Sequence, residues 1–133
     1  MGISIVVHME YRKRGKKQYL YAGRFQADRY YVLFSLMAGY PSYAQPLYPA
    51  RGLPGNVTKC VLKEYQSWKN GGIAKYASWL TTDELEECVV EAHRLCGDET
   101  DDIWPESYKE IFSYMKDYEN AGEPCRIVFW FDQ

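Results

Sequence analysis

Metal-site and redox-site motifs are missing from this sequence of 133 residues. It has only two histidines, and none of its four cysteines belongs to a C-x-x-C pair (Cys60, Cys88, Cys96 and Cys125). The acidic run at residues 98–102 lacks the spacing and the terminal Glu of an EF-hand loop. We therefore expect no metal, no cofactor, and four reduced cysteines that are mostly buried.

Long apolar runs are also absent. No stretch approaches the length that a membrane-spanning helix needs. The first apolar run, residues 3–9, is interrupted by Ser4 and His8 and is too short for the apolar region of a signal peptide. We expect a protein that spans no membrane and works in the cytoplasm, where cysteines stay reduced.

A complete catalytic set is missing as well. Ser78 is a candidate nucleophile, but no G-x-S-x-G motif surrounds it. The candidate bases are His8, on a predicted strand, and His93, on a predicted helix. The glycine pair at residues 71–72 ends a predicted helix and is no phosphate-binding loop. A small hydrolase or nuclease is therefore only a further alternative, and binding without catalysis is favoured.

The net charge is small, but the charges are unevenly distributed. The net charge is −2, yet residues 1–30 hold seven Lys or Arg against Glu10 and Asp28, which gives 7 − 2 = +5 and leaves −7 for the remainder. A nucleic-acid-coating protein would favour a basic chain overall. This distribution argues against extended nucleic-acid binding and permits a local site for an anion.

The strand signals lie at the two ends of the chain. Apolar residues alternate with others over residues 3–11, and a second strand is expected at residues 18–25 after a basic turn. This pattern predicts a β-hairpin with a basic tip. Residues 127–131 are apolar at every position, which predicts a central strand covered on both faces.

Helical spacing of apolar residues predicts four helices. Asp28 is the expected N-cap of a helix at residues 29–38, and Gly39 its end. Thr81 and Glu84 form a capping box ahead of another helix. The helix after the capping box is expected to end at Gly97. The remaining two helices are expected at residues 57–69 and from Pro105 to Gly122.

Together these elements predict one α+β domain over residues 1–133. A small, mainly antiparallel sheet of three or four strands combines the N-terminal hairpin with the central C-terminal strand, and about four helices pack on it. The residues between Gly72 and Thr81 are expected to form only a short link. The long loop at residues 40–55 contains four of the six prolines, and a loop of this kind tends to be functional.

The segment at residues 29–54 is the candidate binding surface. Arg29 is predicted in the first turn of a helix, where a cation is disfavoured unless it meets an anion or a carboxylate such as Asp28. Gly52 would let the backbone approach an anion beside the Arg51 guanidinium, or would simply turn the chain. Tyrosines beside arginines suit a nucleobase and its phosphate, and they suit a protein partner equally well.

Four segments of the chain follow one another as D-R-Y-Y-V-L-F-S-L-M-A-G (28–39), A-R-G-L-P (50–54), S-W-L-T (78–81) and V-F-W-F-D (128–132). Their order resembles a family of small, largely uncharacterised tailed-bacteriophage proteins, in which S-W-L-T starts a helix. The chain departs from that pattern at Tyr30, where the family has Asn, and at residues 75–77, which lack a frequent His. The resemblance implies phage origin and residence in the host cytoplasm, and no settled activity.

The predicted ligand-binding residues come from this surface and from the neighbourhood of S-W-L-T: Arg29, Tyr30, Tyr43, Tyr48, Arg51, Gly52, Lys75, Ser78 and Trp79. We expect them to bind and sequester a small anionic, nucleotide-like ligand, such as a signal used in host defence. The alternative is an inhibitor or adaptor that binds a host protein through the tyrosine-rich loop. A site between the subunits of a homo-oligomer also stays open.

Overall fold

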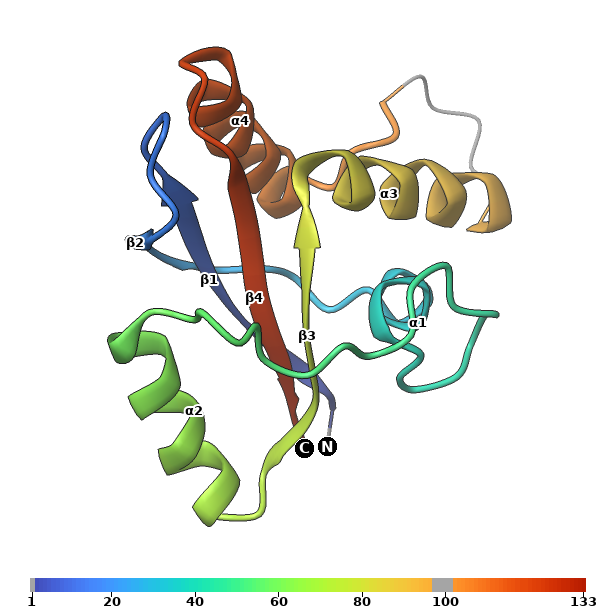
Figure 1. Ribbon diagram of the computed structural model, residues 1–133. Coiled ribbons are helices and arrows are strands. Elements are labelled where there is room, and N and C mark those ends of the chain that lie inside the picture. The colour runs from blue at the N-terminus through green and yellow to red at the C-terminus, as the bar shows by residue number, and fades with distance from the viewer. Residues whose placement is uncertain (1, 97–101) are drawn as a thin grey trace.

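The computed structural model describes residues 2–96 and 102–133 (Figure 1). Within these residues the chain forms four strands and four helices, which confirms the predicted α+β fold. In chain order they are β1 (Ser4–Arg12), β2 (Tyr19–Phe25), α1 (Tyr31–Ala38), α2 (Lys59–Asn70), β3 (Ala74–Thr81), α3 (Thr82–Cys96), α4 (Glu106–Asn120) and β4 (Cys125–Asp132). The described part of the chain has no helix that is both long and apolar enough to cross a membrane.

The four strands form one antiparallel sheet in the order β2-β1-β4-β3 (Figure 1). The C-terminal strand is central, as the sequence predicts, because β4 pairs with β1 on one side and with β3 on the other. Every residue of β4 from Cys125 to Phe131 is buried. A strand without a solvent face requires a packed layer on each side of the sheet.

The two faces of the sheet are covered by different helices. Ile5, Val7 and Phe129 belong to the larger core, which they share with residues of α1, α3 and α4. Val6 and Trp130 belong to a smaller core with Val61 of α2. Figure 1 shows α2 standing apart from the other three helices. This division follows from the strand period of two, which sends neighbouring side chains to opposite faces.

Strand β3 corrects the prediction for the segment before Thr81, where the sequence indicated a short link. Ser78 therefore lies inside a strand and not at the start of a helix. The sequence pattern was obscured by a bulge: pairing with β4 shifts between Lys75 and Ser78, and Tyr76 has a positive φ of 52°. Such a bulge interrupts the alternation of faces by which a strand is recognised.

The start of α1 is a second correction. The helix begins at Tyr31, and its N-cap is Tyr30, which makes no side-chain cap hydrogen bond. Asp28 is held instead by α4, because its N–H donates to Ser107 Oγ at 2.9 Å and its carbonyl accepts from Tyr108 Oη at 2.8 Å. Local preference for an Asp cap is thus overridden by tertiary contacts. The end of α1 at Gly39, with φ 84°, is as predicted.

The capping box before α3 is confirmed. The Thr81 N–H donates to Glu84 Oε1 at 2.9 Å, and the Glu84 N–H donates to Thr81 Oγ1 at 3.4 Å. All four cysteines are free, as expected, but only two of them are buried (Cys88 and Cys125), whereas Cys60 and Cys96 are exposed. Of the predicted acidic loop, residues 98–101 lie outside the described residues.

The burial of β4 generates a prediction about stability. Phe129→Ala should lower the free energy of unfolding by about 3–5 kcal/mol, because a fully buried ring leaves a cavity in the larger core. Tyr43→Ala is the matched control, since the Tyr43 side chain is 65% exposed and should change stability far less. Chemical denaturation followed by circular dichroism measures both. Equal losses in the two variants would contradict the burial of Phe129 in the larger core.

Candidate functional site

The loop between α1 and α2 is fixed along strand β3. The Arg51 N–H donates to Ser78 Oγ at 3.0 Å, and the Gly52 N–H donates to the Ala77 carbonyl at 2.8 Å. Gly52 has a φ of 78°, so the backbone uses the left-handed region that glycine favours. These contacts bring five of the predicted site residues together: Tyr48, Arg51, Gly52, Ser78 and Trp79.

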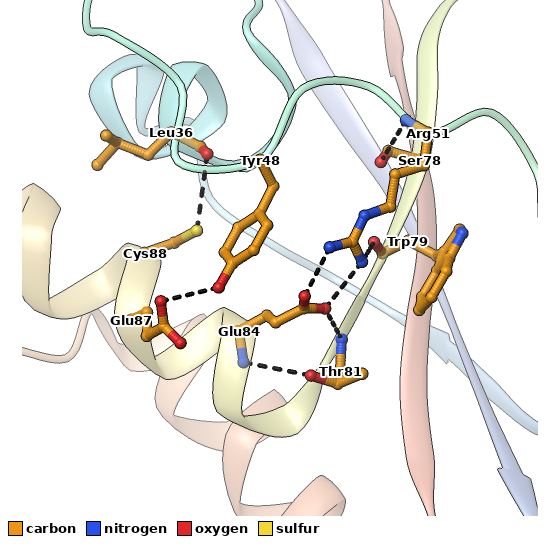
Figure 2. A network of polar contacts seen from close by, with 9 residues as sticks. All are labelled: Leu36, Tyr48, Arg51, Ser78, Trp79, Thr81, Glu84, Glu87 and Cys88. Atoms are coloured by element: carbon orange, nitrogen blue, oxygen red, sulfur yellow. Dashed lines mark hydrogen bonds and ion pairs between the residues drawn. The ribbon is translucent and has the colours of Figure 1, made fainter.

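The Arg51 side chain reaches between two aromatic rings to a carboxylate (Figure 2). Its guanidinium carbon lies 4.9 Å from the Tyr48 ring centroid and 4.5 Å from that of Trp79. Nη1 and Nη2 donate to the two carboxylate oxygens of Glu84 at 2.8 and 2.6 Å, and Nη1 also donates to the Trp79 carbonyl at 3.1 Å. The charge of Arg51 is therefore neutralised within the protein, in a bidentate geometry that fixes the loop to α3.

The pKa shifts of Glu84, Tyr48 and Cys88 agree with a structural role for this cluster. The hydrogen bonds from Arg51 hold the pKa of Glu84 below its usual range. Tyr48 Oη donates to Glu87 Oε2 at 2.8 Å, and this bond raises the pKa of Tyr48 to about 12. Burial raises the pKa of the Cys88 thiol to about 12 as well, so this cysteine stays protonated at neutral pH.

The remaining predicted site residues make their contacts elsewhere. Arg29 precedes α1 and donates to Ser4 Oγ at 3.1 Å, so the helix-dipole argument for an anion beside it does not hold. Tyr30 packs against the larger core. Tyr43 meets the Tyr31 ring edge-on at 5.7 Å, and Lys75 is exposed on β3.

A cleft of about 470 Å³ lies between β2 and the start of α2, the helix that packs on the face of the sheet formed by Val6 and Trp130. One wall is residues 18–21 and the other is residues 56–60. The N-cap of α2, Thr58, makes no side-chain cap hydrogen bond, and the first turn holds no acidic residue. The first intrahelical bond runs from the Leu62 N–H to the Thr58 carbonyl at 3.0 Å. The N–H groups of residues 59–61 thus have no intrahelical acceptor, and the helix dipole makes this end positive.

A buried ion pair between Glu10 and Arg126 contacts residues on both walls of the cleft. Arg126 donates from Nε to Glu10 Oε1 at 2.8 Å, and the two side chains are 5% and 0% exposed. Arg126 Nη1 also donates to Asn56 Oδ1 at 2.9 Å, and its guanidinium carbon lies 3.5 Å from the Tyr19 ring centroid. Glu10 Oε2 accepts the Thr58 N–H at 2.8 Å. The pair is neutral overall, so it positions both walls without adding net charge.

The cleft residues were not among the sequence-predicted site residues. The signals for them were present separately, since the basic hairpin and the start of α2 could each be recognised. Their proximity depends on α2 packing against Val6 and Trp130, which no local pattern reports. In the described ranges 2–96 and 102–133, no three His, Cys, Asp or Glu side chains are grouped as a metal site requires.

No protein-family model, curated protein or solved structure matches this chain. The resemblance to tailed-phage proteins therefore stays a prediction from the four sequence segments.

The bond between Arg51 and Glu84 predicts a pH-dependent contribution to stability. Because folding lowers the pKa of Glu84, the stabilisation is complete above the unfolded-state value of about 4.3 and is lost as pH falls through the folded-state value. Glu84→Gln should cost about 1.5–3 kcal/mol at pH 7, the value of hydrogen bonds to charged groups. The difference from wild type should shrink between about pH 5 and pH 3.

Glu91→Gln is the matched control for this measurement. Glu91 also pairs with an arginine, Arg94, but the Arg94 side chain is 69% exposed. A solvent-exposed pair contributes little, so this variant should follow the wild-type pH profile. Thermal unfolding from pH 3 to pH 8 measures all three proteins. A Glu84→Gln deficit that is independent of pH would show that the carboxylate charge is not the cause.

Proposed function

We propose that this protein binds and sequesters a small anionic ligand that carries a planar ring, such as a nucleotide, in the cleft between β2 and α2. The supporting observation is that tyrosine rings on β2 stand across from the uncapped, positively polarised start of a helix. The proposal keeps the ligand class that the sequence predicts and moves its site from residues 29–54 to the β2–α2 cleft.

The start of α2 is suited to a phosphate. Free N–H groups in the first helical turn and the helix dipole together favour an anion. Lys59 adds a full positive charge on the same wall of the cleft. A second hollow of about 350 Å³, lined by Lys13, Lys16 and Lys17, shares Gln18 and Leu20 with the cleft. The basic hairpin tip therefore lies beside the β2 wall of the cleft.

The β2 wall is suited to a ring. Tyr19 and Tyr21 line the cleft, and Tyr21 is 41% exposed. Stacking of a nucleobase on an aromatic side chain contributes about 1–3 kcal/mol per base. The volume of about 470 Å³ lies within the usual range of small-molecule sites, about 300–1,000 Å³.

The cluster around Arg51 is a weaker candidate. An anion there would have to displace Glu84 from a bidentate pair and would leave that carboxylate without its partner. The cleft demands no such exchange. Because the sequence resembles tailed-phage proteins, we further propose that the ligand is a nucleotide signal of host defence and that the protein acts in the host cytoplasm.

Ligand binding is tested by a thermal-shift screen against mono-, di- and cyclic nucleotides. A binding nucleotide should stabilise the protein by about 2.7 kcal/mol at 100 times its dissociation constant. Lys59→Glu should weaken binding by at least about 10-fold, which is about 1.4 kcal/mol, because it places a like charge at the phosphate site. An acidic residue near a helix N-terminus is otherwise favourable, so the variant should remain folded.

Lys63→Glu is the control, since it makes the same charge change on α2 at an exposed position outside the cleft. It should retain the nucleotide-dependent rise in Tm. The proposal fails if no nucleotide raises the Tm of the wild type, or if Lys59→Glu and Lys63→Glu respond alike.

A further inference from the structure

Tyr21, on the wall of the cleft, ends a chain of polar contacts that runs into the protein. Its hydroxyl lies 2.9 Å from His8 Nδ1. On the other side of the ring, His8 Nε2 lies 2.8 Å from Glu64 Oε2. The three residues come from β2, β1 and α2, so the fold assembles a hydroxyl, an imidazole and a carboxylate in series.

The order of the three groups fixes which ring nitrogen carries the proton. His8 is only 2% exposed, and burial lowers its pKa, outweighing the opposing influence of Glu64. The neutral ring must place its hydrogen on Nε2, because a lone pair there would face the Glu64 carboxylate at 2.8 Å. Nδ1 is then an acceptor, and the Tyr21 O–H donates to it.

The other charged groups near His8 have opposing effects on its pKa, and the imidazole stays neutral until it accepts a proton from Tyr21. Arg24 Nη1 donates to Glu64 Oε1 at 3.1 Å, and the Arg24 charge also lowers the pKa of His8, whereas Glu10 raises it. Although Nε2 lies 2.8 Å from Glu64 Oε2, it has no hydrogen-bond partner of acceptable geometry among the described residues. The 2.8 Å separation becomes an ion pair when the ring is protonated. Trp130 closes the remaining side, with its ring centroid 5.4 Å from that of His8.

The Tyr21 phenol needs such a base to react. Burial, together with the nearby Cys60 and Glu64, raises the pKa of Tyr21, so it stays protonated at rest. Removal of the proton by His8 during attack avoids a free phenolate, as a histidine does for the hydroxyl of a serine triad. Cleft access and a hydrogen-bonded base thus meet at one oxygen, the Tyr21 hydroxyl.

We propose that Tyr21 is a nucleophile that captures the phosphoryl group of a phosphate ester or anhydride held in the cleft, with His8 as its base and Glu64 as the residue that positions His8. This inference rests on the proposed anion-binding cleft. In the step, a bond forms between Tyr21 Oη and phosphorus while the bond from phosphorus to the leaving oxygen breaks. The phenol proton moves to His8 Nδ1, and the leaving oxygen departs from the side of phosphorus opposite Tyr21 and takes its proton from solvent water. The ligand fragment stays attached to the protein, which would make sequestration covalent.

The test uses sulfonyl fluorides, whose sulfur replaces phosphorus as the electrophile. One probe is adenosine with a fluorosulfonylbenzoyl group at the 5′ position, and the other is phenylmethanesulfonyl fluoride, which has no nucleoside. In both, an O–S bond forms, the S–F bond breaks, and the phenol proton leaves with fluoride as HF. Intact mass and peptide mapping measure the rate at Tyr21 and at Tyr43. Tyr43 is more exposed, and its contacts are with Tyr31 and Ser35 and not with a histidine.

At pH 7 Tyr21 should react about 100-fold faster than Tyr43, the lower end of what a general base contributes. Tyr21→Phe should abolish labelling of that peptide and leave Tyr43 labelling unchanged. His8→Asn should lower the labelling rate of Tyr21 to about that of Tyr43. In Glu64→Gln the Tyr21 rate should lie between those of the wild type and His8→Asn. If His8→Asn does not fold, Glu64→Gln provides the same comparison from a residue on the helix surface.

The pH profile separates activation from a structural role. The Tyr21 rate should reach its plateau near neutral pH with a midpoint below 6.5, the usual pKa of histidine, because it follows neutral His8. A tyrosine without a base reacts as its own phenolate, so its rate should climb towards pH 10. Rapid labelling by the small probe but not by the nucleoside probe would support the activated tyrosine and contradict the nucleotide ligand. The inference is overturned if Tyr21 reacts no faster than Tyr43 with either probe, or rises only near pH 10.

Discussion

The buried ion pair between Glu10 and Arg126 is the interaction on which the α2 side of the molecule depends. The two residues are direct partners in the register of β1 and β4, so the pair also marks the correct alignment of the central strands. Both side chains are almost fully buried, and loss of one partner in such a pair typically costs about 3–5 kcal/mol. The same two side chains hold Asn56, the Thr58 N–H and the Tyr19 ring. One neutral pair therefore sets both walls of the cleft.

The contrast between Arg51 and Arg126 is the reason why we propose the cleft, and not the tyrosine-rich loop, as the binding site. Both guanidinium groups are matched by one glutamate and stacked on tyrosine. The pair at Arg51 joins the loop to the start of α3, where the capping box satisfies the N–H groups of Thr81 and Glu84. The pair at Arg126 lies beside the start of α2, where Glu10 accepts the Thr58 N–H and the N-cap makes no side-chain cap hydrogen bond to the following turn.

The spacing of apolar residues and the positions of capping and turn residues predicted most of the fold. The exceptions have physical causes. The hairpin, the central strand and the capping box at Thr81 all follow from local patterns that the tertiary structure retains. Strand β3 was missed because the bulge at Tyr76 breaks its alternation. The cap at Asp28 was wrong because α4 takes its backbone groups.

The candidate site was less accessible to prediction. The aromatic neighbours of Arg51 could be anticipated, but its partner Glu84 lies 33 positions further along the chain, inside a motif already explained as a helix cap. The cleft joins residues 18–21 to residues 56–60 through a helix that packs on the second face of the sheet. Contacts of this range depend on the register of β1 and β4 and are not encoded in any single segment.

A nucleotide titration followed by amide chemical shifts tests the central claim most directly, because it reports where a ligand binds. Binding at the cleft predicts shifts concentrated at residues 18–21 and at the amides of residues 58–61, with Arg51 and Trp79 unchanged. Shifts centred on Tyr48, Arg51 and Trp79, or no shifts with any nucleotide, would contradict it.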